Sequence, residues 1–343
     1  MAVTDMSDVL CLCFVMGSFY FFIKYVSGSE KSFLFFILFA TAAFMTRYAA
    51  AIILFFPLIV SIKYFLKTLN IKLFLLSCLG VVLVFAPYYY FKNGNMRGMV
   101  QHYSIFGWDI SNMFKRNFVT ADGTQHYTLP NFIYCFSNLF SPGYFFAGFI
   151  VLFFVSKKHF NNSISKLVLL SWIAYSVFLG GIPFQNNRIL LLSFPLVLIF
   201  LFPATISCWK YVQEKIKFQK TVIVLICLCQ LALFTRAFIP FYKYNRTEKE
   251  IISEMIQRKQ SIVYTSEVTA ALHAYEVPQK VVDLWDKPID TIEKPSLLLV
   301  NLPKFEKQWK GMNVMNNYNF IKANSSLTLI KTFNGGWELY EIR

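Results

Sequence analysis

Charged residues are scarce in this chain. Only 15% of its 343 residues are Asp, Glu, Lys or Arg, whereas 56% are hydrophobic and the mean hydropathy is +0.50. Soluble domains carry about 25% charged residues, so this composition excludes a wholly soluble protein. Acidic residues are rarer than basic ones, and twelve of the 18 acidic residues follow residue 241. We therefore predict an all-α polytopic membrane domain over residues 1–241 and a more polar domain over residues 242–343.

Several recognisable motifs are also missing. No basic residue precedes the first apolar segment, so no cleavable signal peptide is recognisable. The tail lacks a glycine-rich phosphate loop and a nucleophile elbow, which excludes those catalytic motifs there. No spacing of Cys, His, Asp or Glu matches a metal site, and the seven cysteines lie in or beside apolar segments. We expect no metal centre and interpret the cysteines as small packing residues.

Four short loops between the apolar segments contain lysine but no arginine, and they occur at every second connection along the chain. These loops, around Lys24 and Lys31 and at 63–72, 157–166 and 210–220, hold twelve lysines. The positive-inside rule places them in the cytoplasm. They supply most of the net charge of +15, so nucleic acid is not an expected partner. The eight predicted apolar segments are 9–26, 31–45, 49–65, 71–88, 131–155, 167–182, 188–207 and 221–241.

The arginines of the first 241 residues all lie at the opposite ends of these segments. Lysine would suffice to hold charge at a membrane face, whereas the planar guanidinium grips phosphate or carboxylate at two points. The outer face is therefore predicted to bind an anion. These arginines are Arg47, Arg97, Arg116, Arg188 and Arg236, and the tail adds Arg246, Arg258 and Arg343.

The first candidate site is the corner at Thr46, Arg47 and Tyr48. Segment 31–45 reaches only about 22 Å at 1.5 Å per residue, against a hydrocarbon core of about 30 Å. Its outer end should stop below the surface, where an arginine needs water or a partner. We predict that Arg47 binds a phosphate with support from Tyr48. Snorkelling of Arg47 to lipid headgroups is the alternative.

A second corner has the same design. Gln185, Asn186, Asn187 and Arg188 stand between two short apolar segments. The first turn of a helix offers N–H groups to an anion, and Arg188 is predicted to lie in that turn. We therefore predict Arg188 as the second phosphate ligand, supported by Gln185 and Asn187. Capping of the following helix by an asparagine is the alternative.

Other polar residues complete the predicted outer face. Asp8 opens the first apolar segment, where it would cap the helix or share in proton transfer. Arg97 and His102 belong to an outer loop over residues 89–130 and are predicted to support the site. This loop is rich in aromatic residues and methionine, and it suits either the membrane interface or a cover over the substrate.

The tail over residues 242–343 is predicted to be a small α/β domain with a role in support or recognition. Thr247 would cap its first helix. Strands are predicted at 262–265, 280–284 and 297–301. A hairpin is predicted at 327–333 and 336–342, because Asn334-Gly335 is a typical hairpin turn.

Four motifs occur in a particular order: Ser7-Asp8, Met45-Thr46-Arg47-Tyr48, Ala86-Pro87-Tyr88-Tyr89, and residues 185–191 followed by Pro195. With the outer tail, they make the chain similar to membrane-embedded GT-C glycosyltransferases that use a polyprenyl-phosphate sugar. The nearest likeness is to bacterial members of the protein O-mannosyltransferase and lipid A aminoarabinose transferase superfamily. The resemblance covers the C-terminal two-thirds of such an enzyme.

The resemblance implies an inverting sugar transfer at the outer face of the inner membrane. The donor would be a polyprenyl-phosphate sugar, the acceptor a glycan, lipid or protein, and the tail would be extracytoplasmic. No cofactor is implied, although a divalent cation is compatible with the chemistry. The family's main acidic residue follows its first transmembrane helix. Here no apolar segment precedes Asp8, so the resemblance implies that the catalytic carboxylate is absent from this chain. Asp8 is the remaining candidate, and we expect the chain to be a fragment. A flippase or transporter for a lipid-linked anion and a non-catalytic scaffold are the alternatives.

The predicted topology places Lys215 in the cytoplasm and Asn334 outside. Single cysteines at these two positions, in a chain without its native cysteines, should react differently with an impermeant thiol reagent in intact cells. We expect labelling at position 334 only. Labelling at 215 and not at 334 would invert the sidedness on which the anion site depends.

Overall fold

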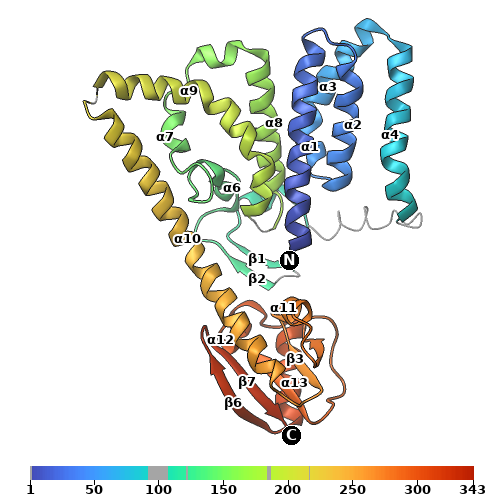
Figure 1. Ribbon diagram of the computed structural model, residues 1–343, viewed down its shortest axis with the longest axis vertical. Coiled ribbons are helices and arrows are strands. Elements are labelled where there is room, and N and C mark those ends of the chain that lie inside the picture. The colour runs from blue at the N-terminus through green and yellow to red at the C-terminus, as the bar shows by residue number, and fades with distance from the viewer. Residues whose placement is uncertain (1, 92–106, 121–122, 184–186, 216) are drawn as a thin grey trace. The chain divides into compact units, whose positions relative to one another are not determined.

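A computed structural model describes residues 2–91, 107–120, 123–183, 187–215 and 217–343. The chain forms two compact units. The first comprises Met1–Arg116 and Tyr127–Leu233, and the second comprises Asn117–His126 and Phe234–Arg343. The first unit is helical, and the second contains a β-sheet flanked by helices (Figure 1).

The first unit is a membrane-type helical assembly. Within the described residues, five helices are long and apolar enough to cross a bilayer: α1 (Ala2–Val26, apolar from Asp8), α3 (Ala50–Thr68), α8 (Ser163–Gly180), α9 (Phe194–Lys215) and α10 (Gln219–Ile256). Two more helices are apolar but carry shorter apolar stretches, α2 (Ser32–Thr46) and α4 (Ile71–Phe91). The predicted short second helix is thus confirmed at 15 residues.

The expectation of eight apolar helices is wrong. Residues 131–155 form only short pieces: α6 (Asn131–Tyr134), η2 (Ser137–Leu139) and α7 (Gly148–Leu152). Pro142-Gly143 interrupts the run, and the freed backbone groups bond to side chains instead. Gln230 of α10 donates to the Pro142 carbonyl and accepts from the amide of Phe146. Such a break inside a membrane requires internal partners of this kind.

The packing of α1 against α2 orders the start of the chain. Gly17 lies so close to Phe39 that an added Cβ would stand 2.3 Å from the ring. Phe21 stacks on Phe35 with ring centroids 5.0 Å apart. The absence of a side chain at Gly17 therefore allows the close approach of the two helices, and their aromatic rings fill the rest of the interface.

The second unit contains a five-stranded mixed sheet. Its strands are β3 (Ile262–Thr265), β4 (Lys280–Asp283), β5 (Ser296–Val300), β6 (Leu327–Phe333) and β7 (Trp337–Ile342), in the order β4-β3-β5-β7-β6. Strands β4, β3 and β5 are parallel, and β7 pairs antiparallel with β5 and β6. The five strands confirm the predicted strands, and Gly335 has the positive φ (+78°) expected of the predicted turn.

Both faces of this sheet are covered. The end of α10 and α11 (Thr269–Ala274) pack on one face, while α12 (Leu302–Gln308) and α13 (Asn313–Asn324) pack on the other. The predicted α/β character of the tail is therefore confirmed. A small hairpin, β1 (Asn117–Thr120) with β2 (Gly123–His126), joins this unit, since Gly123 lies against Gln308 of α12.

Thr247 does not cap a helix, contrary to expectation. Helix α10 runs without a break from Gln219 to Ile256 and passes through Pro240. Thr247 lies inside it, and its hydroxyl donates to the Lys243 carbonyl one turn earlier. The apolar segment and the amphipathic stripe that follows share one helical period, so nothing forces a new helix start at Thr247.

Asn317 of α13 fastens the connection between β4 and β5. Its amide donates to the carbonyls of Leu284 (2.8 Å) and Lys287 (2.7 Å), and its oxygen accepts from the Ile289 amide (2.8 Å). We predict that Asn317→Ala will accelerate hydrogen exchange at Ile289 by on the order of a hundredfold, because three hydrogen bonds are lost, one of them the bond of the Ile289 amide itself. Exposed Asn319 provides the matched control, and equal exchange in both variants would contradict the prediction.

Candidate functional site

The first corner holds an ion pair. Arg47 ends α2 in an extended conformation (φ −150°), and its amide donates to the Ala43 carbonyl. Its Nε lies 2.7 Å from Oδ1 of Asp8 on α1. Asp8 and Arg47, for which the sequence predicts different roles, thus form an ion pair. The Arg47 side chain keeps 35% of its surface exposed, whereas that of Asp8 keeps only 6%.

Asp8 does not open its helix as predicted. Helix α1 begins at Ala2, so Asp8 lies inside the helix and is buried. A carboxylate in this setting is stabilised by a cation and not by the helix terminus, because the dipole effect fades beyond the first turn. The ion pair also gives Arg47 a partner inside the protein, whereas snorkelling would direct its side chain to lipid headgroups.

Two tyrosines of the membrane unit's core were not singled out by the sequence. Tyr175, on α8, is fully buried, and Tyr144, in the broken segment, packs against the same hydrophobic core. In a chain with 19 tyrosines and 39 phenylalanines, two aromatic residues in apolar segments look like ordinary core residues. The hydroxyl group was the one available signal.

The second corner differs from its prediction in one respect. Asn187 and Arg188 begin a 3-10 helix, η4 (Asn187–Leu192), and α9 starts only at Phe194. Pro195 suits the first turn of an α-helix, which explains the later start. Arg188 is therefore not in the first turn of a long α-helix. The side chains of Asn187 and Arg188, and the whole of Gln185, lie outside the described residues.

The outer loop packs against this second corner. The indole N–H of Trp108 donates to the Phe178 carbonyl (2.7 Å), and the Asn112 amide donates to Gly181 (2.9 Å). A Cβ at Gly181 would lie 2.2 Å from the Trp108 ring, so glycine is needed for this approach. Residues 107–116 thus cover the end of α8. The described part of the loop contains η1 (Ile110–Met113) and no surface α-helix, and a cover over the substrate stays a prediction.

The two corners are linked through the interior. The Tyr175 hydroxyl donates to the carbonyl of Ile189, the residue after Arg188, at 3.0 Å. Helix α1, which carries Asp8, packs against η4, and Leu190 and Leu192 of η4 are buried. The structure therefore brings the Asp8–Arg47 pair and the backbone of Arg188 into one part of the membrane unit.

The structure places some of the remaining predicted site residues and does not describe the others. The Tyr48 ring packs on Phe44 with centroids 5.6 Å apart. Arg116 is exposed. Arg97 and His102 lie outside the described residues. In the part of the chain that the structure describes, no three His, Cys, Asp or Glu side chains gather as metal ligands do.

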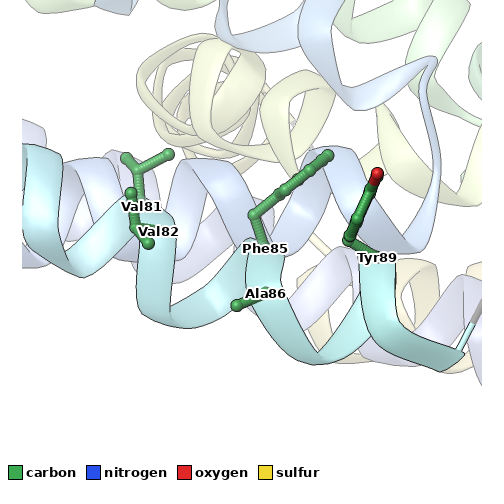
Figure 2. Close-up of a pocket in the computed structure, with 5 residues that line it drawn as sticks. All are labelled: Val81, Val82, Phe85, Ala86 and Tyr89. Carbon is green, nitrogen blue, oxygen red and sulfur yellow. The ribbon is translucent and has the colours of Figure 1, made fainter. Parts of the chain in front are cut away.

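A shallow hollow on α4 offers different chemistry. The side chains that line it all come from this helix, and the Tyr89 hydroxyl is their one polar group: Val81, Val82, Phe85, Ala86 and Tyr89 (Figure 2). The rings of Phe85 and Tyr89 stack at 6.3 Å. Such an apolar surface suits acyl chains, whereas an anion requires cations. We therefore place the candidate anion site at the corners.

Comparisons of the chain with family models, with curated proteins and with solved structures found no match. The assignment of a function therefore depends on the geometry of this site and on the residues of the sequence.

Asn131 anchors the turn after α8. It is fully buried, and its amide donates to the carbonyls of Gly180 (3.0 Å) and Ile182 (2.8 Å). We predict that Asn131→Asp, which replaces this donor with oxygen, will destabilise the protein by on the order of 3 kcal/mol. Thermal unfolding of the purified chain should show a lower Tm. Asn161→Asp, at an exposed position, is the control, and an equal shift in both variants would refute the anchoring role.

Proposed function

We propose that this protein is a membrane glycosyltransferase of the GT-C type. It would move a sugar from a polyprenyl-phosphate donor to an acceptor at the outer face of the inner membrane. The observation that carries the proposal is the Asp8–Arg47 ion pair, buried on the carboxylate side and partly open on the arginine side. The apolar helices make the chain a membrane protein of several spans, which suits a lipid-linked substrate.

The ion pair can orient Arg47 toward a phosphate. Nε is the guanidinium nitrogen that lies 2.7 Å from Asp8, and the side chain keeps 35% of its surface exposed, so the two terminal nitrogens can serve another anion. A guanidinium can bind one anion through Nε and another through its terminal nitrogens. Arg47 would thus bind the donor phosphate while Asp8 holds the plane of the guanidinium. Arg188 would supply the second cation.

The proposed reaction inverts the anomeric carbon. An acceptor hydroxyl attacks that carbon and forms a new glycosidic bond, while the bond to the phosphate oxygen breaks. Polyprenyl phosphate leaves with the electron pair, and arginine stabilises its growing charge. A carboxylate accepts the proton of the acceptor hydroxyl. The sequence offers Asp8 as a candidate for that proton acceptor, but in this proposal its ion pair with Arg47 gives it the orienting role instead.

The second unit would lie outside the cytoplasm and assist recognition. It contains the sheet, and the hairpin β1–β2 of the outer loop belongs to it. The proposed partners are the bilayer, the lipid-linked donor and an acceptor glycan, lipid or protein. This loop joins the membrane unit at one end and the second unit at the other. A loop in such a position is suited to move when a substrate binds.

The decisive variants are Arg47→Lys and Arg188→Lys. Each keeps the charge but loses the two-point fork, so the full chain in nanodiscs should bind polyprenyl phosphate about tenfold more weakly. Arg236→Lys, at an exposed position on α10, should bind within about twofold of the parent. Phosphatidylglycerol in every nanodisc makes general attraction to anionic lipid equal in all samples.

Two results would count against the proposal. Unchanged affinity in both Arg47→Lys and Arg188→Lys would remove the phosphate assignment. Transport of the lipid across vesicles without release of polyprenyl phosphate from a polyprenyl-phosphate sugar would favour a flippase over a glycosyltransferase.

A further inference from the structure

Large apolar side chains are exposed on two neighbouring pieces of the membrane unit, residues 107–116 and 127–134. The most exposed is Phe114, which keeps 72% of its surface. Its ring centroid lies 6.3 Å from that of Phe132, so the two pieces meet in one surface. We call this surface the apolar patch, and its exposed members are Trp108, Ile110, Phe114, Leu129 and Phe132.

Hydrogen bonds attach both pieces to the last turn of α8. The indole N–H of Trp108 donates to the carbonyl of Phe178 (2.7 Å), and the amide of Asp109 donates to the carbonyl of Gly181 (3.0 Å). Asn131 holds the second piece to the same turn through its two side-chain bonds. The depth of the apolar patch in the membrane is therefore set by the end of α8.

The length of α8 places that end at the boundary of the hydrocarbon region. Its apolar window covers the 18 residues of Ser163–Gly180. At 1.5 Å per residue this window is about 27 Å long, and the hydrocarbon core is about 30 Å thick. Both ends of a helix that crosses with this length lie near the headgroups. The apolar patch therefore stands where acyl chains and headgroups meet.

The charges beside the patch suit anionic headgroups. Lys115 and Arg116 directly follow Phe114 in the sequence, and both are exposed. The ammonium of Lys115 also donates to the side-chain oxygen of Asn112 (3.0 Å), which fixes its direction. Asp109, the one acidic residue of the sequence 107–116, caps η1 with its carboxylate. Two exposed cations and an indole beside apolar rings are typical of segments that lie in the membrane interface.

Water is a poor neighbour for this surface. Each Å² of apolar surface left in water costs about 25 cal/mol, and contiguous exposed patches mark contacts with proteins or membranes. A membrane is favoured over a protein here, because the patch continues directly from a spanning helix and carries cations that match phosphate. These observations hold whichever side of the membrane the end of α8 faces.

We propose that the apolar patch is an interfacial anchor that binds anionic phospholipid. Its rings enter the acyl region of the adjacent leaflet, while Arg116 and Lys115 contact headgroup phosphates. The inference does not depend on the proposed function, since it requires neither a sugar donor nor the Arg47 corner.

The test uses a photoreactive phenylalanine in the full chain. Benzoylphenylalanine replaces Phe114, and the protein is irradiated in vesicles of equal parts phosphatidylcholine and phosphatidylglycerol. Mass spectrometry should find phospholipid adducts at position 114 in a yield within about threefold of that at Leu170, which is exposed on the apolar span of α8. Asn319, exposed on α13, is the polar reference, and its yield should be about tenfold lower or less.

A second measurement tests the cations. Phosphatidylglycerol should be enriched over phosphatidylcholine in the adducts at position 114 by up to about fivefold, because each cation at the surface attracts anionic lipid. Arg116→Gln should remove most of this enrichment. The matched control is Lys220→Gln, which removes an exposed cation from another loop and should leave the enrichment unchanged.

Three results would overturn the proposal. A lipid yield at position 114 no higher than at Asn319 would show that the patch faces water. Crosslinked dimers or adducts with other proteins in place of lipid adducts would show that a protein covers it. Lipid adducts without enrichment of phosphatidylglycerol would remove the role of Arg116 and Lys115 in headgroup binding.

Discussion

The meeting of one carboxylate and one guanidinium constrains the membrane unit more than any other contact. Asp8 is buried, and a lone carboxylate in that place would be strongly disfavoured. Arg47 lies 2.7 Å away and makes its burial tolerable. The pair joins α1 to the corner between α2 and α3, so the position of three helices depends on it. The same pair leaves part of the arginine exposed, which gives the site its proposed chemistry.

The rest of the membrane unit obeys the related rule that polar backbone groups must find partners inside the protein. Side-chain amides perform this task at the end of α8 and at the break in the segment 131–155. Asn131 and Asn112 bond to the carbonyls at the end of α8, and Gln230 bonds to the interruption at Pro142. Water is scarce in the hydrocarbon region, so each of these amides replaces several missing bonds to solvent. These amides thus satisfy backbone carbonyls where the chain is irregular.

The second unit is built on different physics. Its sheet is apolar on both faces, and each face is covered by its own set of helices. Parallel strands buried on both faces read as continuous apolar runs, as Leu297, Leu298, Leu299 and Val300 of β5 do. Asn317 then secures the irregular connection to β5. This unit depends on hydrophobic burial in water, whereas the membrane unit depends on internal satisfaction of polar groups.

Local patterns determined much of the architecture. Apolar runs predicted α1 to α4 and α8 to α10, and the shortness of α2 followed from a count of its residues. Alternation and the Asn334-Gly335 turn predicted β6 and β7 of the second unit. These features depend on neighbours in the sequence. The run at 131–155 misled the prediction, because average hydropathy does not register the bonds from Gln230 that allow the chain to break there.

The sequence by itself determined that this chain enters a membrane, that its tail is an α/β domain, and which cations occupy which loops. It also drew attention to Asp8, Arg47 and Arg188. Only the tertiary structure decided that Asp8 pairs with Arg47 and that Tyr175 bonds to the residue beside Arg188. The physical reason is that these partners come from different helices. Whether they meet depends on how the helices pack, and no periodicity or motif along the chain encodes that packing.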